Sequence, residues 1–164
     1  GLTSMIKVVK TGIALVMVMG CSLAVAQDAD VKREISAIIA GVYGSFQEHE
    51  PEGIDRYMDP DVTVWDVFTP QLIQGKAERD RFHAADQQQM QARGPLTLVI
   101  SEPIVSNWDD TAIARYYLDY KYGPPNAAQG RVRITDVFRR INQQWKIVHH
   151  HEGAVPTGIP PIAD

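Results

Sequence analysis

The stretch that decides the fold is RVRITDVFRRINQQWKIVHHHEG, residues 131–153. Both of its arms alternate β-branched or aromatic residues with polar ones. In a β-strand, successive side chains point to opposite faces, so such alternation is typical of strands with one buried face. The sequence predicts two strands here, 130–142 and 144–153.

Further strands precede this pair. Alternating segments predict strands over 61–67, 96–108 and 111–122, and LIQG (72–75) predicts a brief one. NWDD (107–110) and GPPNAAQG (123–130) are rich in turn residues and separate the long strands. The last four strands are expected to run antiparallel to one another.

Three helices are expected, all in the N-terminal half. The first follows a cap at Asp28 or Asp30 and ends near EHEPEG (48–53). Its apolar residues form one helical stripe: Val31, Ile35, Ile38, Ile39, Val42 and Phe46. The second helix spans 51–58, with a proline in its first turn, and the third spans 76–92. Helices gathered on one side of an antiparallel sheet define an α+β fold.

The N-terminal segment has the pattern of a secretory signal. Met5 is the expected start, with a non-native remnant ahead of it, and Lys7 and Lys10 form a basic region. An apolar run over 12–24 then leads to small residues at 24–26. We expect cleavage after Ala26 and a periplasmic or secreted protein. The apolar run is too short for a bilayer-spanning helix, so no membrane attachment is expected after cleavage.

An alternative is a lipoprotein anchored through Cys21, because VMGC (18–21) loosely resembles a lipobox. Cys21 is the only cysteine, so cleavage after residue 26 leaves no disulfide and no thiol nucleophile. Cleavage also removes Lys7 and Lys10, which reduces the 16 basic residues to 14 against 20 acidic ones, a net charge of −6. This charge argues against nucleic acid as a partner.

Several strings look like the NTF2-like superfamily, whose cone-shaped, cystatin-like fold packs three N-terminal helices on a curved antiparallel sheet. The strings are GIDRYMDPDVTVWD (53–66), QGKAERDRF (74–82), RVRITDVFRR (131–140) and WKIVHHHEG (145–153). The last two resemble the SnoaL-like, ketosteroid isomerase-like subgroup that also contains the kinase II association domain. The resemblance assigns 27–155 to one such domain and leaves 156–164 as a Pro-rich tail.

The resemblance implies an apolar pocket inside the cone and a homodimer through the convex face of the sheet. Asp66 matches the general base of ketosteroid isomerases. Asp136 matches their protonated oxyanion donor, a carboxylic acid that an apolar site keeps neutral. Local alternatives are that Asp66 caps the following turn and that Asp136 pairs with Arg133 or Arg139.

Other residues carry weaker signals. His83 lies on a partly apolar helix face, where it is a second acid or base or simply a packed residue. Alternation separates Tyr117 and Asp119 from Tyr116, and the association-domain resemblance directs the first two to the pocket. Tyr43 lies near the position of the oxyanion tyrosine of isomerases.

The three histidines at 149–151 cannot share one strand face. The resemblance to the NTF2-like superfamily implies that Val148, His150 and Glu152 face the pocket. His149 and His151 are then expected on the convex face beside Trp145. We therefore predict no native metal and no cofactor.

Two hypotheses remain open. One is an exported enzyme that performs metal-free isomerisation, dehydration or cyclisation on a small apolar molecule. The other is a non-catalytic ligand-binding or oligomerisation module. The predicted catalytic residues are Asp66, Asp136, His150 and His83. The predicted ligand contacts are Tyr43, Trp65, Phe68, Phe82, Tyr117, Asp119, Phe138 and Glu152.

Overall fold

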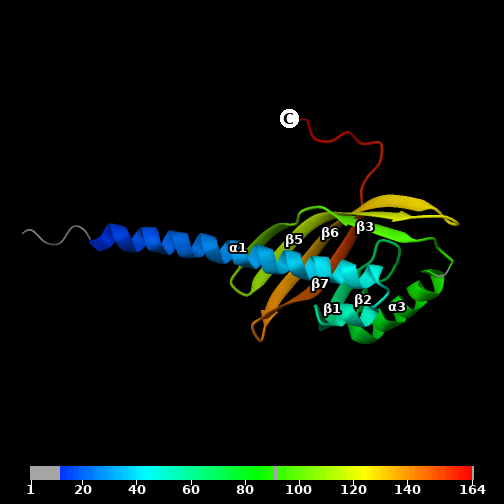
Figure 1. Ribbon diagram of the computed structural model, residues 1–164, viewed down its shortest axis with the longest axis horizontal. Helices are drawn as coiled ribbons and strands as arrows, with labels where there is room; N and C mark the ends of the chain where they lie inside the picture. Colours follow the sequence, from blue (N-terminus) through cyan, green and yellow to red (C-terminus); the bar gives the residue numbers. More distant parts are fainter. Residues whose placement is uncertain (1–11, 91, 164) are drawn as a thin grey trace, which may run out of the picture.

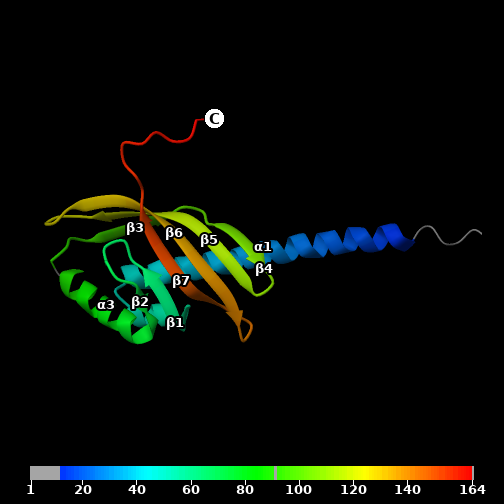
Figure 2. The same cartoon turned by 180° about the vertical axis from the view of Figure 1, so that it is seen from behind.

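One curved sheet and the helices on its inner side make up the computed structural model, which describes residues 12–90 and 92–163 (Figure 1). Within these residues, seven strands form the sheet in the order β2-β1-β7-β6-β5-β3, with β4 also paired to β5. Figure 2 shows the sheet from its outer side, with the long N-terminal helix passing behind it. The expected α+β class is confirmed.

The strands form where alternation predicts them. Their bounds are β1 (Met58–Trp65), β2 (Ile73–Gln74), β3 (Leu96–Ile100), β4 (Ile104–Trp108), β5 (Thr111–Tyr122), β6 (Ala128–Ile141) and β7 (Gln144–Ala154). The single strand expected over 96–108 is two strands, because Pro103 has no N–H to donate to a ladder. Both halves pair antiparallel with β5.

The sheet is mixed, because β1 and β7 pair in parallel. β5, β6 and β7 follow one another through short turns and are antiparallel, as expected. No short turn joins β1 to β7, so sequence proximity does not set their relative direction.

The helices are α1 (Gly12–Gln47), α2 (Pro51–Asp55) and α3 (Gly75–Met90). The apolar stripe of α1 packs into the core, with Val31, Ile35 and Ile39 buried. The predicted cap at Asp28 or Asp30 is wrong, because α1 runs through both positions. Asp28 instead accepts a hydrogen bond from Asn107 of β4 (3.2 Å), and Asp30 pairs with Arg33.

A bulge in β7 changes the predicted faces of this strand. Val137 lies opposite His149 but Phe138 lies opposite Ile147, so Val148 is an extra residue without a partner. Ile147 and His150 therefore both point inward. The expected alternation across this point is wrong: Trp145 is buried on the inner side, and Val148 does not line the cavity.

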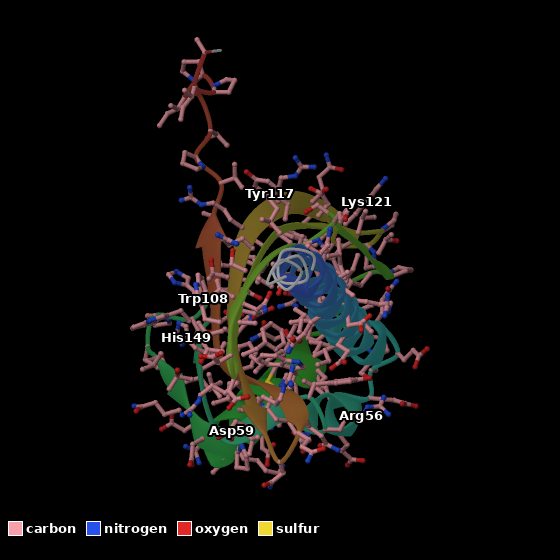
Figure 3. All side chains as sticks on the ribbon, turned by 90° about the vertical axis from the view of Figure 1, so that its left-hand side faces the viewer. Arg56, Asp59, Trp108, Tyr117, Lys121 and His149 are labelled. Atoms are coloured by element: carbon pink, nitrogen blue, oxygen red, sulfur yellow. The ribbon has the colours of Figure 1, made fainter. Side chains whose placement is uncertain are left out.

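The outer face of the sheet carries the residues expected there. His149 is partly exposed and His151 is exposed, and Figure 3 shows His149 on the side of the sheet away from the helices. Whether this face joins two copies of the chain stays a prediction.

The signal segment is only partly covered, because Lys7 and Lys10 lie outside the described residues. Among the helices in the described part of the chain, none is long and apolar enough to cross a membrane. Residues 155–163 follow β7 without forming a helix or strand.

Candidate active site

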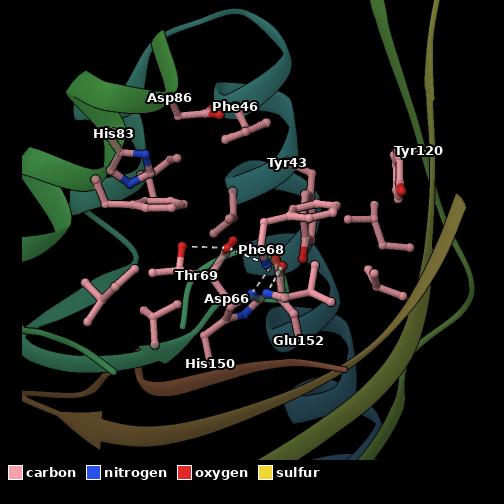
Figure 4. Close-up of a pocket in the computed structure, with 18 of the residues that line it drawn as sticks. Tyr43, Phe46, Asp66, Phe68, Thr69, His83, Asp86, Tyr120, His150 and Glu152 are labelled. Carbon is pink, nitrogen blue, oxygen red and sulfur yellow. Dashed lines mark hydrogen bonds and ion pairs between the residues drawn. The ribbon is translucent and has the colours of Figure 1, made fainter. Parts of the chain in front are cut away.

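A cavity of about 340 Å³ lies between α1, α3 and the inner face of the sheet. Most of its wall is apolar, with side chains such as Phe46, Phe82 and Leu118. Polar groups gather at two places on this wall, as Figure 4 shows. Asp66, His150 and Glu152 lie together at the sheet, and His83 lies across the cavity on α3.

Asp66 lies just after β1, where the chain turns toward β2. Its Oδ1 accepts hydrogen bonds from the backbone N–H of Phe68 and from the Thr69 hydroxyl, both at 2.9 Å. The turn-capping alternative is thus correct, and Asp66 also lines the cavity. Burial and the negative charge of Glu152 raise the pKa of Asp66, and the two hydrogen bonds only partly offset this effect.

Glu152 and His150 lie side by side at the cavity wall. His150 Nε2 lies 3.1 Å from Glu152 Oε1, and Glu152 Oε2 accepts a 3.3 Å hydrogen bond from the Val67 backbone N–H. Burial opposes ionisation of Glu152, but the hydrogen bond and charge of His150 outweigh it and lower the pKa of Glu152. Of the two neighbouring carboxyl groups, Asp66 is therefore the one with the higher affinity for a proton.

Asp136 lies behind His150, on the side away from the cavity. Its Oδ1 is 2.5 Å from His150 Nδ1, and its Oδ2 accepts a 2.6 Å hydrogen bond from the Tyr116 hydroxyl. Tyr43, which lines the cavity, lies 3.2 Å from the Tyr116 hydroxyl. Six side chains thus form one chain of contacts, which we call the polar relay: Tyr43, Tyr116, Asp136, His150, Glu152 and Asp66.

The carboxylates determine the direction of hydrogen bonding in the polar relay. A carboxylate only accepts, so His150 donates from both ring nitrogens and is a cation. Burial alone would lower the pKa of His150, but the carboxylates of Asp136 and Glu152 raise it to about 10. Because the Tyr116 hydroxyl donates its one hydrogen bond to Asp136, the Tyr43 hydroxyl is the donor in its contact with Tyr116. Burial raises the pKa of both tyrosines, so both stay neutral.

The predicted position of Asp136 needs correction. It is on the inner face, 1% exposed, but it is covered by its neighbours and does not line the cavity. Both of its carboxyl oxygens are engaged by His150 and Tyr116, so the predicted direct contact between Asp136 and a ligand is wrong. Phe138, expected as a ligand contact, is fully buried in the core instead.

Three further expected ligand contacts point away from the cavity. Tyr117 and Trp65 are 46% and 41% exposed, and Figure 3 shows Tyr117 on the outer side of the sheet. Asp119 pairs there with Arg131, with N–O distances of 2.6 and 2.7 Å. On β5, Tyr116 lies on the inner face, because it is two residues away from both Ala114 and Leu118, which are buried. The apolar residues two positions before and two positions after it were the signal in the sequence that could have identified Tyr116.

The remaining predicted residues do line the cavity: Tyr43, Asp66, Phe68, Phe82, His83, His150 and Glu152. Burial and the charge of Arg79 lower the pKa of His83, so this imidazole is neutral near pH 7. Arg79, which sequence reasoning missed, also lines the cavity and is 3% exposed. No local pattern distinguishes it from the exposed arginine two positions later.

Metal ligation is a separate question. In the described part of the chain, no group of three or more His, Cys, Asp or Glu side chains is arranged to hold a metal ion. His149 is hydrogen-bonded through Nδ1 to the Thr63 hydroxyl (2.7 Å), on the outer face.

The SnoaL-like domain family matches residues 35–157, and the chain belongs to this family. No curated protein matches the sequence. Solved structures confirm the NTF2-like, cystatin-like fold expected from the sequence.

An NTF2-like protein from Streptomyces avermitilis, with a provisional dehydratase assignment, is 21% identical, with a TM-score of 0.67 over 80% of this chain and 99% of its own. A provisionally assigned ketosteroid isomerase from Shewanella frigidimarina is 16% identical, with a TM-score of 0.61 over 71% and 92%. A provisionally assigned calcium/calmodulin-dependent protein kinase II association domain from Xanthomonas campestris is 17% identical, with a TM-score of 0.63 over 76% and 88%. At these identities the similarity shows the fold alone.

Proposed function

We propose that this protein is an enzyme that moves a proton within a small, largely apolar molecule, by isomerisation or elimination of water, with Asp66 as the acid–base group. The observation that carries the proposal is the polar relay, which ends at a cavity-lining carboxyl group with a raised pKa. A general acid or base works best when its pKa approaches the working pH.

Asp66 is well placed for a proton shuttle. Its ionised form would take a proton from a substrate carbon next to a carbonyl group. In an isomerisation its protonated form would return the proton to another carbon; in a dehydration it would give the proton to the hydroxyl group that leaves as water when the C–O bond breaks. The proton count of the enzyme is then unchanged after each turnover. Glu152 stays ionised beside it, because the His150 cation compensates its charge.

Asp136 and Tyr116 are positioning residues in this proposal. Asp136 contacts His150, Tyr116 donates to Asp136, and neither residue lines the cavity. Together they hold the His150 ring in the orientation that contacts Glu152. Tyr43 contributes a neutral hydroxyl to the cavity wall.

The test uses a series of small cyclic ketones, beginning with 3-cyclohexenone, whose isomerisation to the conjugated 2-cyclohexenone is followed by ultraviolet absorbance. Proton exchange at the carbon next to the carbonyl is followed in D₂O by mass spectrometry. We expect Asp66→Asn to lower the rate by about 100-fold or more. The matched control is Asp61→Asn, at an exposed carboxylate on β1. Equal rates for wild type and Asp66→Asn, or no reaction of any ketone with wild type, would contradict the proposal.

The second hypothesis is a module without catalytic activity. A cone filled by its own side chains would favour oligomerisation alone, but the cavity has room for a ligand. Ligand binding without turnover is therefore the alternative that competes with catalysis. It predicts that ketones bind to wild type and exchange no protons.

We also propose export, because a basic segment, an apolar run and small residues at 24–26 follow one another. Expression of the full chain in a bacterium with N-terminal sequencing of the periplasmic product tests this. A mature protein that begins at Gln27 is expected, and an uncleaved cytoplasmic product would contradict it.

We propose a homodimer through the outer face of the sheet, which carries the partly exposed aromatic side chains of Trp65 and Tyr117. Aromatic residues are enriched at such interfaces. Light scattering on wild type and Tyr117→Arg tests this, since the arginine should weaken the dimer. A monomeric wild type would contradict it.

A further inference from the structure

Arg79 is a buried cation whose hydrogen bonding is incomplete. Its side chain is 4% exposed, and Nη2 pairs with Asp55. Its Nε and Nη1 are buried and have no hydrogen-bond partner. An unpaired buried donor on a charged group costs free energy, so native proteins rarely leave such donors without a role.

Arg79 is also one of the residues that line the cavity. Arg79 and His83 lie four residues apart on one face of α3, and both line the cavity. His83 is neutral beside Arg79, so it adds one donor and one acceptor without adding charge. Figure 4 shows His83 across the cavity from His150 and Asp66, which places this wall opposite the proposed acid–base group.

The charges around Arg79 leave it only partly compensated. Its partner Asp55 is shared with Lys76, whose Nζ lies 3.0 Å from Asp55 Oδ2. The other acid on this side of the cavity, Asp86, pairs with Arg93 at 3.0 Å. On the opposite wall, Glu152 is compensated by His150. No free carboxylate in the described part of the chain is thus aimed at Arg79 Nε or Nη1.

From these observations, we propose that Arg79 binds the carboxylate of a small apolar acid, so that the substrate carries an anionic group at one end and its reacting carbon at the other. Guanidinium groups bind carboxylates through charge-assisted hydrogen bonds. Nε and Nη1 are covered by neighbouring atoms of the protein, so the ligand reaches them by displacing a wall side chain. The displacement is more favourable for an anion than for a neutral ligand, because the anion then forms charge-assisted hydrogen bonds with the guanidinium.

In naming a substrate class, the inference rests on the proposed function, but anion binding can be measured without turnover. The probes are cyclohexanecarboxylate and cyclohexanecarboxamide, which have nearly the same shape and differ in charge. Their small apolar ring suits a cavity of about 340 Å³. Calorimetry gives the affinity of each probe for wild type, Arg79→Gln and Arg81→Gln. Arg81 is on the same helix with its side chain 72% exposed, so its variant is the matched control for loss of one positive charge.

We expect wild type and Arg81→Gln to bind the acid at least about 10-fold more tightly than the amide. Arg79→Gln should lose this preference while it keeps its affinity for the amide. Equal binding of the two probes by wild type, no binding of the acid, or an unchanged preference in Arg79→Gln would overturn the proposal.

A second measurement does not depend on the folding of a variant. In ¹⁵N-labelled wild type, the Nε–H resonance of Arg79 should shift with the acid and stay unchanged with the amide. An unshifted resonance at saturating acid would overturn the assignment. Asp66→Asn separates this inference from the proposed function: it should keep the acid preference even as it loses proton exchange. If only Arg79→Gln loses the preference for the acid and Asp66→Asn keeps full proton exchange, the catalytic role of Asp66 is refuted. The assignment of Arg79 as the carboxylate-binding residue then still stands.

Discussion

His149 and His150 are neighbours in the chain but occupy opposite environments. His150 is 8% exposed and lies between two carboxylates on the inner face, where its pKa is raised to about 10. His149 lies on the outer face beside Thr63, and partial burial with the nearby His151 lowers its pKa. Near pH 7 the same side chain is thus a cation on one face and a neutral ring on the other. The partners on adjacent strands decide the charge, not the residue type.

The largest expected effect is on the pH dependence of stability. The pKa of His150 is about 10 in the folded protein and about 6.5 when unfolded, so its stabilising contribution is complete below pH 6.5 and is lost as the pH rises toward 10. We expect the free energy of unfolding to fall by several kcal/mol over this range, measured by urea titration at pH 6, 8 and 10.

NMR titration compares the protonation of His149 and His150 directly. The His149 ring should titrate below pH 6.5, and the His150 ring should stay protonated until near pH 10. A His150 ring that titrates with an ordinary pKa would show that the carboxylates do not hold its proton.

The next largest change in the free energy of unfolding is expected when the His150 cation is replaced. His150→Gln leaves Asp136 and Glu152 without their shared partner, and breaking a buried ion pair costs about 3–5 kcal/mol. Chemical denaturation measures the free energy of unfolding of this variant against wild type. His149→Gln, a change at an outward-facing residue, should cost less than about 1 kcal/mol. Similar losses in the two variants would remove the proposed difference between the faces.

Tyr116 and Tyr117 are also neighbours on opposite faces of β5, and we expect a smaller difference in stability between their variants. Tyr116→Phe removes one donor to Asp136 and the acceptor of the Tyr43 hydroxyl, which should cost about 1–3 kcal/mol. Tyr117→Phe changes an exposed outer side chain and should stay within about 0.5 kcal/mol of wild type. Thermal unfolding of the pair gives the difference directly. A larger loss for Tyr117→Phe would place the critical tyrosine on the other face.

The smallest expected effect concerns the link between His149 and Thr63. Thr63→Val removes the hydroxyl that lies 2.7 Å from His149 Nδ1 and keeps the side-chain shape. Because this site is partly open to water, we expect less than about 1 kcal/mol of destabilisation and an unchanged His150 resonance. A shift of His150 would mean that the two faces are coupled.

Much of the architecture could be predicted from the sequence. Strand alternation and the apolar stripe of α1 are local patterns, and they identified the helices and the main strands. The family resemblance placed Asp66, His150 and Glu152 at the cavity. It also directed Tyr117 and Asp119 there, although the buried parity of Ala114 and Leu118 favoured Tyr116.

Local patterns in the amino-acid sequence were enough to predict which segments are helix or strand and which face of most strands is apolar, because these properties repeat over a few residues. The bulge at Val148, the protonation of His150 and the unpaired donors of Arg79 became apparent only in the tertiary structure. These depend on groups from different elements: Asp136 on β6 lies opposite His150 on β7, and Asp55 on α2 meets only one nitrogen of Arg79 on α3. Electrostatic and hydrogen-bonding environments arise only when such distant segments pack together, so no local pattern contains them.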